Sequence, residues 1–224
     1  MSDDARNGFL ATFGEAGASG PAWLCALRKE AMSAFAAAGF PTTAQEDWRY
    51  TNLSPLARTS WGRARPGAAA LDREVIERLS FPVFACSVFV FVNGRFEPGL
   101  SAPRALSGGV EVGSLAAAVS ARPGAVEPHL GRLFRPEDAP LAALNTALFE
   151  DGAFVHLPEG ASIEAPIHLV HLSLPEEGPT ASHPRTLVVA GPESRATVIE
   201  DFVSLGAGRA LTNAVTEVVV AADA

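Results

Sequence analysis

Cysteine is scarce in this sequence, and the two cysteines lie far apart. Cys25 and Cys86 are the only ones among 224 residues, so the chain has neither a disulfide framework nor a Cys-x-x-Cys motif. Both stand in apolar surroundings, which predicts two reduced, largely buried and unligated thiols. Such sparse cysteine is typical of proteins in a reducing, cytoplasmic setting.

Long apolar runs and excess positive charge are also lacking. No apolar stretch reaches the ~20 residues that a membrane-spanning helix needs, and the polar opening MSDDARNG does not resemble a signal peptide. The formal net charge of −8 argues against nucleic acid and anionic membranes as partners. We therefore expect a cytoplasmic protein that binds neither.

Motifs for common chemistries are missing as well. No Gly-rich phosphate-binding loop of standard spacing and no nucleophile elbow occurs. The residues therefore show no active site, and no catalytic, cofactor-binding or metal-binding residue is predicted. What is present is an ordinary globular composition, 48% hydrophobic and 19% charged. A chain of this length can bury a large core without disulfides or metals.

The first 140 residues combine helical and strand-like patterns. Apolar residues recur at helical spacing, and Gly39 with Pro41 forms a stop signal after the longest such run. A capping box from Thr43 to Glu46 predicts one further helical turn. Residues 54–70 are rich in Pro and Gly and are expected to form a linker. The expected helices are a short one around residues 9–13 and the segments 22–38, 71–79, 115–119, 129–134 and 141–148.

A hairpin signal follows in the same half of the chain. Asn93-Gly94 lies between a run of β-branched and aromatic residues and a second short run. It predicts antiparallel strands at 87–92 and 95–97, with a positive φ at Gly94. Residues 110–112 are a candidate for a further strand.

The aromatic segment around Trp48 and Tyr50 has two interpretations. In one, both rings pack locally beside a surface pair of Asp47 with Arg49. In the other, the segment is a recognition surface for another subunit. The pattern alone leaves both open.

The stretch 144–171 organises the remainder of the chain, because almost everything after it is typical of short strands. The expected strands are 154–157, 167–172, 186–190, 196–203 and 213–220. No helix-length pattern separates them, which favours a winding β architecture of stacked coils over βαβ units. Their starts show no clean period, so a sandwich or jelly roll remains an alternative. We place a domain boundary at 140/141.

Histidines and carboxylates provide the candidates for a metal or acid–base site. His168 and His171 are three residues apart, so in a strand they point to opposite faces and only one can join His156. The remaining candidates are His183, Glu150, Asp151 and Glu164. A cupin-type His-x-His metal motif is absent.

The adjacent acids Glu200 and Asp201 are candidates for a pair of catalytic carboxylates that act on a polysaccharide. Two carboxylates that flank a glycosidic bond can cleave it. Neighbouring residues in a strand point apart, however, so one of these two is expected to face solvent.

Six blocks of the sequence resemble the SufD proteins of the SufB/SufD family. The first, FPTTAQEDWRYTNL at 40–53, resembles their N-terminal signature and distinguishes them from SufB. The others are VFVFVNGRF at 88–96, LNTALFEDGAFVHLPEG at 144–160, and the strands 185–191, 196–202 and 211–217. The blocks occur in the family's order over nearly the whole chain.

This resemblance implies a mixed, mainly β fold. An N-terminal helical and α+β domain, residues 1–140, would precede the first coils of a right-handed parallel β-helix, residues 141–224. The implied function is a non-catalytic scaffold in iron–sulfur cluster assembly that pairs with SufB and the SufC ATPase. The segment itself would bind no cofactor, and the cluster would form only at the level of the complex.

Family members run longer than this chain. The SufB contact, the ATPase contact and the proposed cluster-site histidine are therefore expected beyond residue 224, and no family site residue is transferred to this sequence. A coil end without a cap would also let the chain self-associate. The alternative function is a β-helix carbohydrate-active enzyme or a metal-binding jelly-roll protein.

Overall fold

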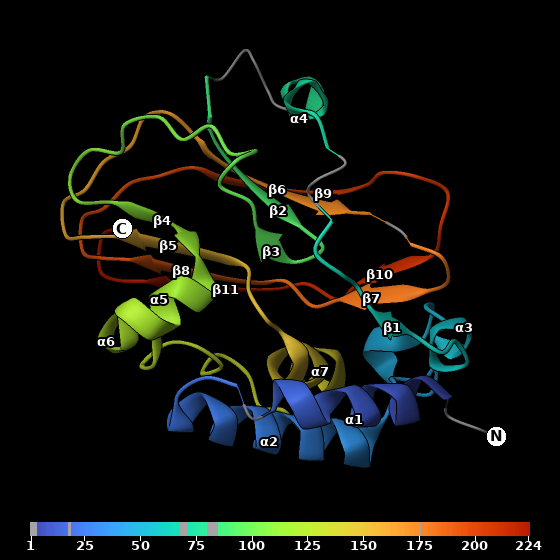
Figure 1. The fold of residues 1–224 in the computed structure, drawn as a ribbon. Coiled ribbons are helices and arrows are strands. Elements are labelled where there is room, and N and C mark those ends of the chain that lie inside the picture. The colour runs from blue at the N-terminus through green and yellow to red at the C-terminus, as the bar shows by residue number, and fades with distance from the viewer. Residues whose placement is uncertain (1–3, 18, 68–70, 80–84, 175) are drawn as a thin grey trace.

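The computed structural model describes residues 4–17, 19–67, 71–79, 85–174 and 176–224. It is a mixed α/β fold in which most helices gather along one side of a set of strands (Figure 1). The helical elements are α1 (Asp4–Ala16), α2 (Ala22–Ala38), the 3-10 turn η1 (Glu46–Trp48), α3 (Ser54–Ala57), α4 (Arg73–Leu79), α5 (Leu115–Ala121), α6 (Pro123–Val126) and α7 (Pro140–Leu148). The strands are β1 (Gly62–Arg63), β2 (Ser87–Val92), β3 (Arg95–Phe96), β4 (Glu111–Ser114), β5 (Ala153–Leu157), β6 (Ile167–Ser173), β7 (Thr180–Ser182), β8 (Arg185–Ala190), β9 (Val198–Ser204), β10 (Ala210–Thr212) and β11 (Val215–Val220).

Helix α2 forms and ends as its sequence predicts. Gly39 takes a φ of 69° and donates its N–H to the Phe35 carbonyl at 2.7 Å. The next residue, Phe40, packs edge-on against Phe35 with ring centroids 5.5 Å apart. The stop signal therefore both ends the helix and adds an aromatic ring to the core.

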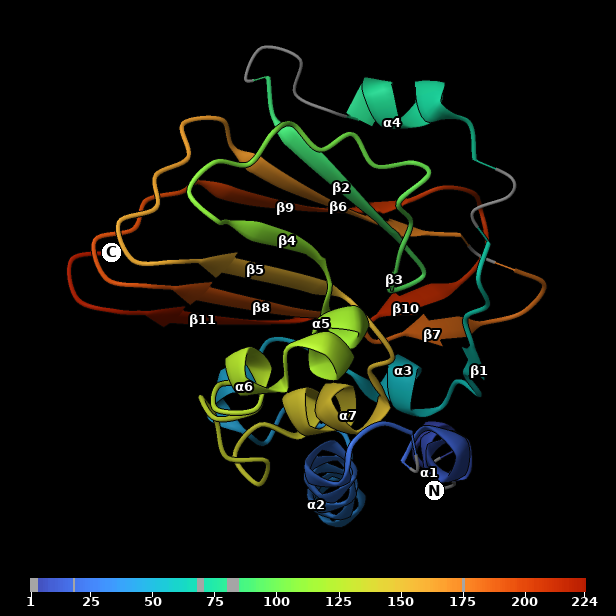
Figure 2. The same ribbon diagram turned by 60° about the vertical axis from the view of Figure 1, so that its left-hand side comes forward.

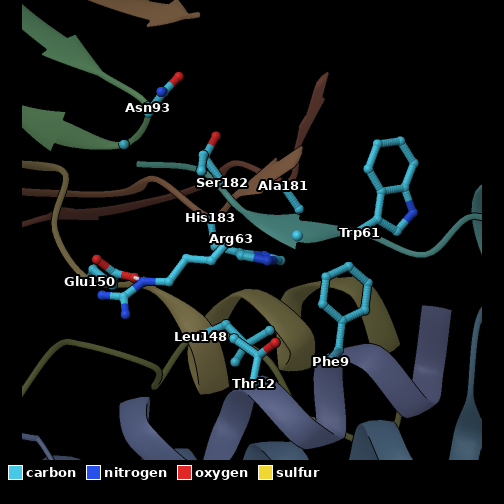
Figure 3. Close-up of a pocket in the computed structure, with 13 residues that line it drawn as sticks. Phe9, Thr12, Trp61, Arg63, Asn93, Leu148, Glu150, Ala181, Ser182 and His183 are labelled. Carbon is cyan, nitrogen blue, oxygen red and sulfur yellow. Dashed lines mark hydrogen bonds and ion pairs between the residues drawn. The ribbon is translucent and has the colours of Figure 1, made fainter. Parts of the chain in front are cut away.

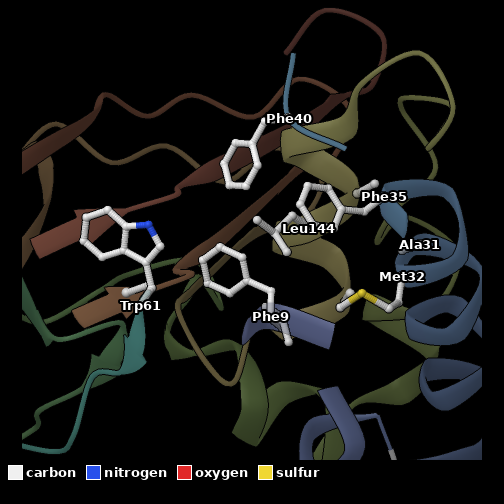
Figure 4. Packing of buried hydrophobic residues seen from close by; sticks show 11 residues of the cluster. Phe9, Ala31, Met32, Phe35, Phe40, Trp61 and Leu144 are labelled. Carbon is white, nitrogen blue, oxygen red and sulfur yellow. The ribbon is translucent and has the colours of Figure 1, made fainter. Parts of the chain in front are cut away.

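A helical layer made of α1, α2 and α7 encloses one hydrophobic cluster. Figure 4 shows Phe9, Phe35, Phe40 and Trp61 converging around Leu144, which belongs to α7. Helix α4 lies on the opposite side of the strands (Figures 1 and 2). There the buried Ile76 packs in a separate cluster with valines of β2.

The strands form three sheets, with orders β3-β2-β6-β9, β4-β5-β8-β11 and β1-β7-β10 (Figure 2). Strands β5 to β11 pair with one another in parallel. In each of these pairs, a residue and its partner on the next strand of the sheet are separated by a nearly constant number of residues in the sequence. The paired residues are Phe154 with Leu187, Arg185 with Val215, Ile167 with Val198, and Thr180 with Ala210. The interval is thus 30 to 33 residues. Parallel ladders of this kind do not occur in a jelly roll, which is built from antiparallel strands.

The sequence pattern did not reveal this regular spacing of strands, because two of the strands are very short. Strands β7 and β10 have three residues each, and they contain mainly Ala, Thr and Ser rather than long apolar runs. Without them the strand starts look irregular, and the expectation of no clean period was wrong.

The predicted hairpin is confirmed. Strands β2 and β3 pair antiparallel, and their turn has φ values of 50° at Asn93 and 81° at Gly94. Asn93 also bridges distant segments, because its Nδ2 donates to the Arg65 carbonyl at 2.8 Å and its Oδ1 accepts from the Leu174 N–H at 2.8 Å. The turn residue therefore also fastens the hairpin to its neighbours.

Three local expectations need correction. Residues 129–134 form turns rather than a helix, because the helical turn starts earlier, at Pro123, whose fixed φ suits a first helical position. The expected linker contains α3 and β1, and β1 pairs with β7; residues 68–70 lie outside the described residues. The capping interaction is shifted by one residue, since Gln45 Oε1 accepts from the Thr42 N–H at 3.1 Å.

Two side-chain expectations also need correction. Cys86 is buried as predicted, but Cys25 is only half-buried, because it lies beside the apolar stripe of α2. Tyr50 is 90% exposed, so it does not pack locally. Arg49 lies over its ring at 5.6 Å and pairs with Glu46 at 3.8 Å instead of Asp47.

Candidate functional site

A buried polar network joins the strands to the helical layer. The Arg185 side chain, at the start of β8, is completely buried. Its guanidinium donates to Asn145 Oδ1 at 3.0 Å, to Thr146 Oγ1 at 3.1 Å and to Glu217 Oε1 at 3.1 Å. Glu217 also accepts the N–H of Gly131 at 2.9 Å. Burial lowers the pKa of Arg185, and the Glu217 carboxylate opposes that shift.

The loop after α7 makes a second set of polar contacts. The Glu150 carboxylate bridges the Arg63 and Arg95 guanidiniums, one on each oxygen. Asp151 accepts the N–H groups of Phe96 and Ala116, each at 3.0 Å. The loop thereby holds β1, β3 and the start of α5 in place.

A small cavity lies where α1, β1, the β2–β3 turn and the end of β7 meet (Figure 3). Its volume of about 30 Å³ leaves room for about one water molecule. His183 lines it, with Nδ1 3.3 Å from Asn213 Nδ2 and its ring edge-on to Phe9 at 5.5 Å. Burial lowers the pKa of His183 to about 3, so this imidazole is neutral at physiological pH. The cavity is a joint between elements and is too small for a substrate.

The four candidate histidines lie apart from one another. His168 and His171 point to opposite faces of β6, as predicted: His168 contacts Asp201 at 2.9 Å, whereas His171 stacks between Phe91 and Phe202. His156 belongs to another sheet and joins neither of them. Within the described ranges, no three His, Cys, Asp or Glu side chains gather at metal-binding separation.

The acidic candidates are likewise separated. Glu200 accepts hydrogen bonds from Thr186 and Thr216, both at 2.7 Å, and lies 3.4 Å from His171 Nε2. Burial alone would raise the pKa of Glu200, but its contacts with His171 and the two threonines lower it overall. Asp201 points to the other face of β9, so the pair does not form a two-carboxylate site. Glu164 is exposed.

Sequence reasoning missed the members of the buried network. A signal for them existed: Asn145 interrupts the apolar helix PLAALNTAL, and Arg185 opens the apolar strand RTLVVA. A polar residue in an otherwise buried element must have a partner. The pattern could not say which partner, because Glu217 is 32 residues away from Arg185.

Comparison with known families shows which family the chain belongs to. Residues 16–169 match the family described as the SufBD protein N-terminal region. Residues 172–224 match the SufBD core domain of SUF-system FeS cluster assembly. The chain belongs to the SufBD family. This family takes part in iron–sulfur cluster assembly.

Relatives of the SufBD family span the same region. A SufBD family protein of Synechocystis sp. is 29% identical over 162 residues, which cover 72% of this chain and 35% of the relative. A SufBD family protein of Arabidopsis thaliana is 27% identical over 188 residues, 76% of this chain and 40% of the relative. The SufD protein of Bacillus subtilis is 32% identical over 85 residues, 38% of this chain and 19% of the relative. The chain therefore spans well under half the length of these relatives.

One further finding concerns the helices. Among the described residues, none of them combines the length and apolarity needed to cross a membrane.

Proposed function

We propose that this SufBD chain acts as a non-catalytic scaffold in cytoplasmic iron–sulfur cluster assembly. In this proposal it pairs with a SufB-like subunit and a SufC-like ATPase, and the cluster is built at the level of the complex without ligands from this segment. The observation that carries the proposal is the match of two consecutive SufBD regions along the chain. The polar networks around Arg185 and Glu150 support it, because they join structural elements.

We also propose that residues 141–224 form the first turns of a right-handed parallel β-helix, preceded by an N-terminal domain of residues 1–140. The repeated interval of 30 to 33 residues in three parallel ladders supports this architecture. Stacked coils of this kind present long, rigid side surfaces, which suit a protein that binds other subunits.

Tyr50 provides a candidate contact for a partner subunit. It is a large aromatic residue at 90% exposure, and the Arg49 guanidinium lies over its ring. Exposed Tyr and Arg side chains are frequent hot spots of protein interfaces. The segment resembles the SufD signature, so a partner from the same assembly system is the expected binder.

The test is copurification of the protein that carries this chain with SufB-like and SufC-like subunits from the same organism. Wild type should form a stable complex. Tyr50→Ala should weaken it about tenfold or more, as for an interface hot spot, and should leave the thermal unfolding midpoint unchanged. Leu133→Ala is the matched control, since Leu133 is also exposed, at 57%. Failure of wild type to bind either subunit would contradict the proposed function.

A further inference from the structure

A surface pocket lies on the outer face of the β4-β5-β8-β11 sheet, beside the junction of α5 and α6. It is an open hollow of about 620 Å³. Three basic side chains, Arg122, His129 and His156, line it together with small residues of the α5–α6 turn. None of its lining residues belongs to the buried network around Arg185 or lines the cavity around His183.

The placement of these groups follows from strand register. Glu111 of β4 pairs with His156 of β5, and His156 pairs with Val189 of β8, so the three form a row across the sheet. Arg122, at the end of α5, reaches down to this row and contacts the Glu111 carboxylate. His129 comes from the turn after α6. The charged or titratable groups facing His156 are therefore Glu111, Arg122 and His129, while β8 contributes only Val189.

The pocket has more hydrogen-bond donors than acceptors. His156 Nδ1 is buried and has no hydrogen-bond partner among the described residues. Burial is the main cause that lowers the pKa of His156, and Arg122 lowers it further; Glu111 raises it, and His129 lowers it by less than Glu111 raises it. The Glu111 carboxylate thus contacts the Arg122 guanidinium and favours the charged form of His156. A second anion in the pocket would meet the Arg122 guanidinium, of which Nη1 contacts Glu111, and the two imidazoles that line the pocket.

We propose that Arg122, His129 and His156 form a binding site for the phosphate group of a small phosphomonoester. Arginine and protonated histidine make strong, charge-assisted hydrogen bonds to phosphate oxygens. The small residues of the α5–α6 turn beside them, Ala121 to Ala125 without Arg122, leave space for the organic part of the ligand. This site goes beyond the scaffold role and does not depend on it.

The site should bind anions more tightly as the pH falls. Sulfate is a useful probe because it keeps its double negative charge throughout the relevant pH range. Because the pKa of His156 is lowered, this imidazole gains its proton on the acid side of the usual histidine pKa of about 6.5, and sulfate affinity should rise there. By linkage, bound sulfate should raise the pKa of His156.

The experiment follows histidine side-chain resonances by NMR while sulfate, inorganic phosphate or adenosine monophosphate is added. Sulfate should shift the His129 and His156 signals in wild type. His156→Gln and Arg122→Gln should each weaken binding about tenfold, as for loss of one charge-assisted hydrogen bond. Arg104→Gln removes an exposed arginine outside the pocket lining and should change nothing.

Several outcomes would overturn the site. If sulfate leaves His129 and His156 unshifted in wild type, the site does not exist, whatever the variants do. If Arg104→Gln weakens binding as much as Arg122→Gln, the attraction is non-specific. Tighter binding of adenosine monophosphate than of inorganic phosphate supports the phosphomonoester, and equal binding refutes it.

Discussion

The Arg185 guanidinium donates to the Glu217 carboxylate, with Nε 3.1 Å from Oε1, and the two side chains are 0% and 2% exposed. Arg185 lies in β8 and Glu217 in β11, its parallel neighbour in the same sheet. Glu217 in turn accepts N–H groups from Gly131 and Arg132. This ion pair therefore links two neighbouring parallel strands, and through Glu217 it also holds the loop at Gly131 and Arg132, which leads to α7.

Removing the charge of Glu217 should destabilise the fold strongly. Glu217→Gln leaves the buried Arg185 without its counter-ion, and breaking a buried pair from one side costs about 3–5 kcal/mol of unfolding free energy. Urea denaturation gives this value directly. Glu164→Gln, at an exposed position, should change it by less than about 0.5 kcal/mol. An equally small effect of Glu217→Gln would mean that the pair contributes little.

Gly152 should not tolerate even a methyl group. A Cβ at this position would lie 2.0 Å from the Arg185 carbonyl oxygen, and the φ of 149° is rare for other residues. Because the obstacle is backbone, Gly152→Ala must shift β5 against β8. We expect a loss of more than about 3 kcal/mol, beyond the usual range for single substitutions. Gly99→Ala is the control, since nothing lies within 4 Å of its Cβ position; similar thermal midpoints for both variants would contradict the prediction.

These residues show how far the sequence could predict the fold. Helix α2 and the hairpin at Asn93-Gly94 were predictable, because their signals are local: apolar spacing, a stop signal and a turn that needs positive φ. The 30-residue interval between Arg185 and its partner Val215 was not, because β7 and β10 are too short to give a pattern. The network around Arg185 was also missed, because its members are far apart in sequence. Only folding brings them together.

His183 should make stability depend on pH. Its pKa is about 3 in the folded chain, against 6.5 ordinarily. Above pH 6.5 the imidazole is neutral in both the folded and unfolded states, whereas between about 6.5 and 3 only the unfolded chain takes up the proton. This group therefore lowers the free energy of unfolding as the pH falls through that interval.

The measurement is urea denaturation at a series of pH values. His183→Gln should flatten the fall in stability between pH 6.5 and pH 4, a range set by the folded and unfolded pKa values of this group. Thr12→Ala alters the same cavity without removing a titratable group, so it should leave the slope as in wild type. An unchanged slope in His183→Gln would show that this histidine is not the source.

The last strands of the three sheets should cause the chain to self-associate. Strands β9, β10 and β11 each end the order of their sheet, so among the described residues one edge of each has no partner strand. On these strands Phe202, Val218 and Val220 are 49%, 50% and 58% exposed. Val218 and Val220 also line, together with Glu200, an open cavity of about 620 Å³. Unpaired strand edges next to apolar surface favour pairing with another chain.

Sedimentation velocity over a range of concentrations tests this prediction on the 224-residue chain. Wild type should sediment faster as its concentration rises. Val218→Lys with Val220→Lys places two positive charges at the exposed edge of β11, so repulsion between copies should shift the equilibrium toward the monomer. Tyr50→Lys adds a charge at an exposed site outside the cavity that β11 lines and should leave association intact. A wild-type chain that stays monomeric at every concentration would refute the prediction, and equal weakening by Tyr50→Lys would place the contact elsewhere.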